Sequence, residues 1–183
     1  MKGLFPLEQE NDTKDNLRLM QMKDPNEALG LAVRLLVGEA PFRDMPLGFS
    51  MGGLVHSIDN GNYFFARRGD VAVGVAFWMF AQPEDAEAWI FRGERISKEA
   101  MDRGGSVGII LGVQAIEPVI AKLLIRTLRD NFSDVDVCYF IRDYGKESNR
   151  KPRATRFVRP RVRRKPKDER LPPNSISTEP IGR

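Results

Sequence analysis

Histidine and cysteine, the side chains that most often serve as catalytic bases, nucleophiles and zinc ligands, are scarce in this sequence. The 183 residues include one histidine, His56, and one cysteine, Cys138. Any Ser–His or Cys–His pair would have to use His56, although its setting is more typical of a helix-end or surface histidine. Cys138 lies in an apolar run, which favours a small buried hydrophobe over a nucleophile. Because zinc sites need several Cys and His ligands, we expect no structural zinc. The carboxylates Glu84, Asp85 and Glu87 could bind a hard cation, but their polar stretch is more typical of a solvated face, so we expect no bound metal.

Positive charge is concentrated at the C-terminal end of the chain. Residues 143–183 hold 13 Lys and Arg against 5 Asp and Glu, whereas the other 142 residues hold 16 against 20. Such a basic segment can bind the phosphates of a nucleic acid, or an acidic protein, including the acidic body of a second copy. Only Phe157 interleaves with these charges, so base stacking is weakly indicated. The nearly alternating cations are Arg159, Arg161, Arg163, Arg164, Lys165 and Lys167.

Hydrophobic periodicity predicts the elements that would position these groups. In chain order we expect a helix from residue 25 to about 36, a hairpin with strands at 63–66 and 71–78, a short helix at 96–103, a strand at 107–113, a helix at 116–132 and a strand at 135–141. This order predicts an α/β (α+β) domain with a mostly antiparallel central sheet flanked by helices.

The chain divides into three parts by composition. Residues 1–25 form a polar arm that we expect to become helical near the domain, which spans residues 26–149. Residues 150–183 form a basic tail with six of the twelve prolines, and we expect it to be extended or disordered. No apolar run approaches the roughly 20 residues that cross a bilayer, and no leader pattern opens the chain. With a single cysteine, these features favour a cytoplasmic protein.

Several positions, collinear over about 130 residues from Ala28 to Phe157, resemble one family. These positions are Arg43-x-x-Pro46, Tyr63 and Arg68 in the hairpin, Val73 and Trp78 in its second strand, Glu99 to Gly104, Arg129-x-x-Phe132, and Ile141-Arg142. In these positions the chain resembles the RTX toxin-activating lysine acyltransferases, which activate haemolysin-type protoxins.

This resemblance implies both a fold and an activity. Members of the family are GNAT-like, with a bent sheet flanked by helices. They transfer a fatty acyl group from acyl-acyl carrier protein to a lysine of the protoxin, often as dimers, with no bound cofactor. The expected partners are therefore an acyl carrier protein, an acceptor protein of the RTX type and a second copy of the chain. Lysine acylation also needs a base for the ammonium proton.

The chain departs from the family where this proton chemistry takes place. The family's histidine falls on Phe42, its aspartate on Leu111 and a serine on Glu39, while a glycine is retained as Gly104. Phe42, Gly104 and Leu111 are thus expected in an acyl pocket or in a structural role.

Three functions remain open. A diverged acyltransferase could use Glu39 or His56 as its base, and burial of Glu39 against Phe42 would raise its pKa. A non-catalytic member could bind an acyl carrier or another protein. An adaptor could bind an acidic partner or nucleic acid through the basic tail.

Overall fold

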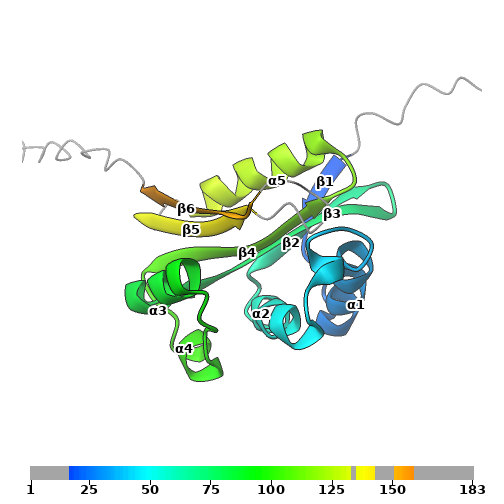
Figure 1. The fold of residues 1–183 in the computed structure, drawn as a ribbon. Helices are drawn as coiled ribbons and strands as arrows, with labels where there is room; N and C mark the ends of the chain where they lie inside the picture. The colour runs from blue at the N-terminus through cyan, green and yellow to red at the C-terminus, as the bar shows by residue number, and fades with distance from the viewer. Residues whose placement is uncertain (1–16, 133–134, 143–150, 159–183) are drawn as a thin grey trace, which may run out of the picture.

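A six-stranded sheet forms the centre of the molecule (Figure 1). The computed structural model describes residues 17–132, 135–142 and 151–158. The strands lie in chain order, and every neighbouring pair is antiparallel except the parallel pair β4–β5, which confirms the expected mostly antiparallel sheet. The strands are β1 (Leu17–Met20), β2 (Tyr63–Arg68), β3 (Val71–Ala81), β4 (Val107–Ala115), β5 (Val137–Arg142) and β6 (Arg153–Val158).

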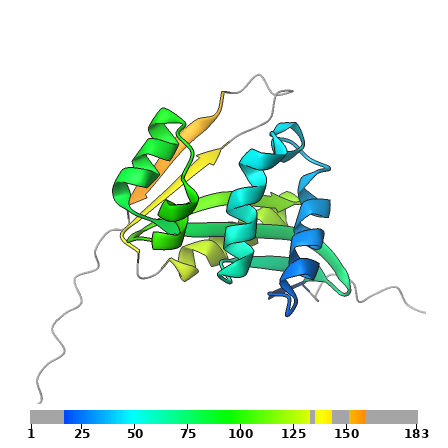
Figure 2. The same ribbon diagram turned by 90° about the horizontal axis from the view of Figure 1, so that it is seen from below.

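Helices cover both faces of this sheet. One face carries α1 (Pro25–Leu36), α2 (Leu47–Asp59), α3 (Pro83–Glu87) and α4 (Lys98–Arg103), with α1 beside α2 and the α3–α4 segment apart from them (Figure 2). The other face carries α5 (Pro118–Asn131), the connection between β4 and β5. The described residues also include a 3₁₀ turn at Phe42–Asp44, between α1 and α2, and a π-helical turn at Ala88–Arg92, directly after α3. None of the described helices is long and apolar enough to span a membrane.

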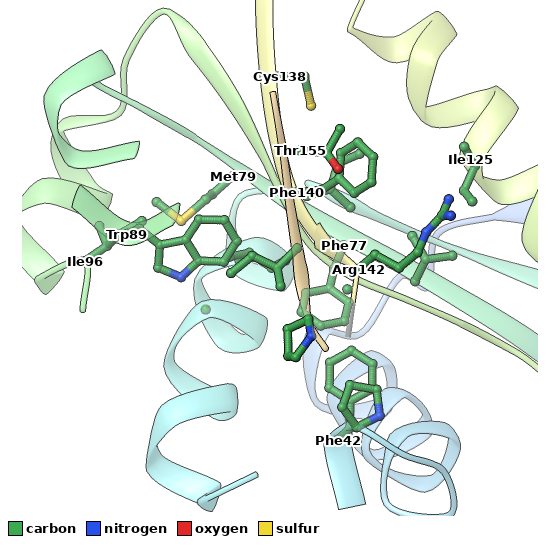
Figure 3. Close-up of a pocket in the computed structure, with 18 of the residues that line it drawn as sticks. Phe42, Phe77, Met79, Trp89, Ile96, Ile125, Cys138, Phe140, Arg142 and Thr155 are labelled. Atoms are coloured by element: carbon green, nitrogen blue, oxygen red, sulfur yellow. The ribbon is translucent and has the colours of Figure 1, made fainter. Parts of the chain in front are cut away.

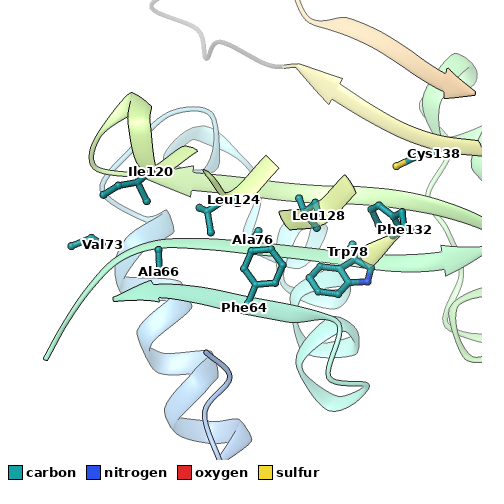
Figure 4. Packing of buried hydrophobic residues seen from close by; sticks show 10 residues of the cluster. All are labelled: Phe64, Ala66, Val73, Ala76, Trp78, Ile120, Leu124, Leu128, Phe132 and Cys138. Carbon is teal, nitrogen blue, oxygen red and sulfur yellow. The ribbon is translucent and has the colours of Figure 1, made fainter. Parts of the chain in front are cut away.

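Strand β3 has a core on each face because its side chains alternate. Ala76 and Trp78 face α5 and pack against a stripe of apolar α5 side chains that includes Leu124 (Figure 4). Val75 and Phe77 face α1 and α2 instead. The hairpin turn that joins β2 to β3 contains Gly69 at φ +58°, in the left-handed region that glycine occupies without strain.

Two edge strands differ from what the sequence led us to expect. Leu17–Met20 lies in the arm expected to become helical, yet it pairs with β2 as β1. Arg153–Val158 lies in the tail that we expected to be extended or disordered. It is extended and pairs with β5 as β6, beyond the domain end expected at residue 149. An edge strand pairs on one side only and buries little, so its sequence carries a weak hydrophobic pattern. The six cations from Arg159 to Lys167 lie outside the described residues.

Strands β4 and β5 separate partway along their length. They pair at three positions, the last of which joins Ile110 to Phe140. Strand β4 then continues to Ala115 paired with β3 alone. At the point of separation Leu111 is the extra residue of a β-bulge, because Phe77 pairs with Gly112 and Trp78 with Ile110. A wedge between two central strands therefore opens at Leu111.

Candidate functional site

A cavity of about 960 Å³ occupies the wedge between β4 and β5. Its lining comes from both faces of the sheet, so the cavity runs through the gap between the strands. Trp89 and Ile96 line one side and Phe42 the base, while Ile125 and Arg142 lie towards α5 (Figure 3). Most of the lining is apolar, and its ionisable groups among the described residues are Arg95, Arg129, Asp130, Cys138 and Arg142.

Glycines let aromatic rings pack close to the wall of the cavity. A Cβ on Gly112 would lie 2.4 Å from the Phe77 ring and 2.8 Å from Cζ of Phe42. The Phe42 and Phe77 ring centroids are 6.1 Å apart. On α2, a Cβ on Gly53 would lie 2.9 Å from Cδ1 of Leu111. Phe42 and Leu111, the positions on which the sequence resemblance places a histidine and an aspartate, both line this apolar cavity.

The remaining polar groups of the cavity are poorly suited to nucleophilic chemistry. Cys138 is buried, as its apolar surroundings in the sequence indicated, and burial raises the pKa of its thiol to about 12. The thiol is therefore neutral at physiological pH, and a neutral thiol is a weak nucleophile. Arg129 lies over the ring of Phe157, with its guanidinium carbon 5.8 Å from the centroid, and so joins α5 to β6 at the cavity.

Glu39 lies away from this cavity. It follows α1 in an exposed turn and is not among the residues that line the cavity. The burial against Phe42 that the sequence suggested is therefore not found. Proximity in sequence was misleading here, because the turn that carries Phe42 into the cavity leaves Glu39 in solvent.

His56 and Gly104 line a second, smaller cavity of about 220 Å³. The Nδ1 atom of His56 is 3.8 Å from Oδ1 of Asp102, and the imidazole side chain is 14% exposed. Asp102 also forms an ion pair with Lys98. Met101 lines both cavities, so the smaller cavity adjoins the larger one. Sequence reasoning missed Asp102, because it is 46 positions from His56 and no local pattern connects them.

The N-cap residue of α5, close to the end of β4, forms an ion pair with an arginine of β2 and makes no side-chain hydrogen bond to the helix. Glu117 is the N-cap residue, and Arg68 donates hydrogen bonds of 2.9 and 3.3 Å to its two oxygens. These hydrogen bonds from Arg68 hold the pKa of Glu117 below its usual range. Pro118 follows and has no N–H. No group of three metal-ligating side chains lies together within the part of the chain that the structure describes.

Comparisons with known proteins support the fold through solved structures, whereas the sequence comparisons find no match. Neither a protein-family model nor a curated protein sequence matches the chain. Among solved structures, a GNAT-like decarboxylase, GphF, in complex with isobutyryl-CoA, matches with a TM-score of 0.53 and 14% identity over 70% of this chain and 67% of that chain. The loading GNATL domain of CurA from Lyngbya majuscula matches with a TM-score of 0.44 and 15% identity over 74% and 70%.

The likeness to GphF supports the fold alone, and the resemblance to toxin-activating acyltransferases rests on the sequence positions given above. With its mixed sheet, its β4–β5 wedge and helices on both faces, the chain has a GNAT-like fold.

Proposed function

We propose that this protein binds the fatty acyl group of a phosphopantetheine thioester, delivered as acyl-acyl carrier protein, in the cavity between β4 and β5. The observation that carries this proposal is the apolar lining of about 960 Å³, to which Phe42 and Leu111 both contribute. Small-molecule sites typically measure roughly 300–1,000 Å³, so the volume is at the upper end and suits a long, flexible ligand.

Binding fits this cavity better than the proton chemistry of the family. A phenyl ring at Phe42 and an isobutyl group at Leu111 cannot carry protons, and the Cys138 thiol is neutral near pH 7. Both replacements add apolar surface to the lining instead. A non-catalytic acyl-binding member of the fold is therefore the function that the site supports best.

A series of acyl-pantetheines tests this proposal without any carrier protein. Each methylene that enters the cavity contributes about 0.8 kcal/mol, so two added carbons should tighten binding roughly tenfold until the cavity is full. Isothermal titration calorimetry with octanoyl to hexadecanoyl chains would measure the dependence. Affinity that is independent of chain length would refute an acyl-binding cavity.

One observation favours lysine acyl transfer as a second candidate, with an RTX-type protoxin as the acceptor that the resemblance implies. His56 lies 3.8 Å from Asp102 in the adjoining small cavity. In this reaction the lysine amine would attack the thioester carbon, pantetheine thiolate would leave, and His56 would accept the ammonium proton while Asp102 orients its ring.

Intact-mass measurements on an acceptor fragment test this second candidate. An acyl-sized mass gain with wild type that is lost in His56→Ala and reduced in Asp102→Asn would support transfer. No gain with wild type, alongside retained acyl-pantetheine binding, would leave binding as the function. The Lys98→Ala variant is the matched control, because it removes the other partner of Asp102 and leaves the imidazole in place.

A further inference from the structure

Five cations lie on α5 and at the end of the β5–β6 ladder, where Arg129 and Arg142 line the cavity, and none of them pairs with a carboxylate of the described residues. Lys122, Arg126 and Arg129 follow one another on the outer side of α5, and Arg142 and Arg153 end the β5–β6 ladder. All five are exposed. We call them the α5–β6 basic face. None of the five is within ion-pair distance of a described carboxylate, whereas Arg68, Arg103 and Lys98 elsewhere are all paired.

Two members of this face oppose each other directly. Arg142 and Arg153 are paired residues of the antiparallel β5–β6 ladder. Directly opposed residues of a ladder point to the same side of the sheet, and two like charges there repel each other. No described carboxylate lies between them, so a bound anionic partner would reduce the electrostatic repulsion between the two guanidinium groups.

The cavity opens onto this same face. Arg129 and Arg142 line the cavity and are exposed, and the half-exposed Phe157, which also lines the cavity, lies under the Arg129 guanidinium. Figure 3 shows Arg142 and Ile125 together on the α5 side of the cavity. A partner held by these cations would therefore be placed to pass an apolar chain into the wedge.

The distribution of charge favours a protein over a free nucleotide-linked donor such as CoA. At the α5 N-terminus, where a phosphate would ordinarily bind, Pro118 removes one N–H group, and the carboxylate of the N-cap residue Glu117, which pairs with Arg68, would repel a phosphate. The available cations are instead spread over about 10 Å of helix between Lys122 and Arg129 and continue onto Arg142 and Arg153. Spacing of this kind matches several carboxylates on one protein surface better than one compact pyrophosphate.

We propose that the α5–β6 basic face docks an acidic carrier protein, which passes its thioester-linked acyl chain into the cavity between β4 and β5. This inference rests on the proposed acyl-binding function and adds the surface that receives the donor. It places docking on the folded domain, so it does not require the basic tail.

A pair of charge-reversed variants tests the surface. Lys122→Glu/Arg126→Glu changes the basic face at two residues that do not line the cavity. Lys23→Glu/Arg34→Glu makes the same change in net charge at exposed positions of the α1 region. Binding of fluorescently labelled acyl-acyl carrier protein is measured by anisotropy at 50 and 200 mM salt, and binding of the corresponding acyl-pantetheine by calorimetry.

We expect the basic-face variant to lose roughly tenfold or more in carrier affinity and much of its salt dependence, while the control variant matches wild type. Both variants should bind acyl-pantetheine like wild type. Unchanged carrier affinity in the basic-face variant would refute the assignment of this face as the docking surface, and so would an equal loss of affinity in the control variant. A wild-type protein that binds no carrier would also refute it.

Two further probes separate this inference from its alternatives. The first is to measure binding of acyl-CoA and of a labelled oligonucleotide. If either binds more tightly than the carrier, and if the basic-face variant loses that binding, the face belongs to that anion and the proposal is overturned. If acyl-pantetheine fails to bind while the carrier still docks through the basic face, the acyl-binding function fails and the docking surface stands.

Discussion

Filling the cavity from helix α2 should abolish acyl binding without harming the fold. Gly52 lies on α2 and lines the cavity, and a Cβ placed there would meet no heavy atom within 4 Å. The Gly52→Leu variant adds four carbons in this space. If they displace up to four methylenes of the ligand at about 0.8 kcal/mol each, acyl-pantetheine affinity falls by about 3 kcal/mol, roughly 100-fold.

A second helical glycine provides the matched control. Gly30 lies on α1, is exposed, has no heavy atom within 4 Å of its Cβ position and does not line the cavity. Leucine is a better helix former than glycine, so each substitution should raise the free energy of unfolding by up to about 1 kcal/mol. Both variants should therefore unfold at or slightly above the wild-type unfolding temperature.

Calorimetric titration with dodecanoyl-pantetheine, alongside thermal unfolding, gives both quantities for each variant. We expect Gly30→Leu to bind like wild type and Gly52→Leu to bind far more weakly at equal or greater stability. Equal affinity of the two variants would refute the assignment of this cavity to the acyl chain, because the added side chain would then occupy space that the ligand does not use.

Other consequences of the structure can be checked independently. Because its pKa is about 12, Cys138 should react with iodoacetamide at pH 8 about a thousandfold more slowly than in the urea-unfolded chain, and comparable rates would contradict its burial. The Arg68→Ala variant should raise the pKa of Glu117 in a carboxylate titration by NMR. Since that pKa is lowered in the folded state, the stability that the pair provides is present near neutral pH and is lost as the pH falls through the folded pKa, so wild type and variant should converge in acid. Removing residues 159–183, which leaves β6 intact, should not change acyl-pantetheine affinity, whereas a large loss would assign the tail to the site.

The regular elements could be read from the sequence where side-chain periodicity is strong. The apolar run from Val71 to Trp78 predicted the second strand of the hairpin, which the structure has as β3, and the apolar stripe through Ile120, Leu124 and Leu128 predicted α5. Strands β1 and β6 could not be read in this way, because each pairs along one edge and buries little. Their place depends on strand pairing across distant parts of the chain.

The site was only partly predictable for the same reason. The family resemblance placed Phe42, Gly104 and Leu111 in an acyl pocket or in a structural role. In the structure Phe42 and Leu111 line the larger cavity and Gly104 lines the smaller one. The wedge itself depends on where β5 stops pairing with β4, which no local pattern encodes. The His56–Asp102 contact and the opposed Arg142 and Arg153 likewise arise from long-range pairing.

The central claim is that the cavity binds the acyl chain that a carrier protein delivers. The most direct measurement compares the affinity of wild type for dodecanoyl-acyl carrier protein with its affinity for the same carrier bearing only the phosphopantetheine thiol. Burial of the chain predicts that the acylated carrier binds at least about 100-fold more tightly. Equal affinity for the two carriers would contradict the account.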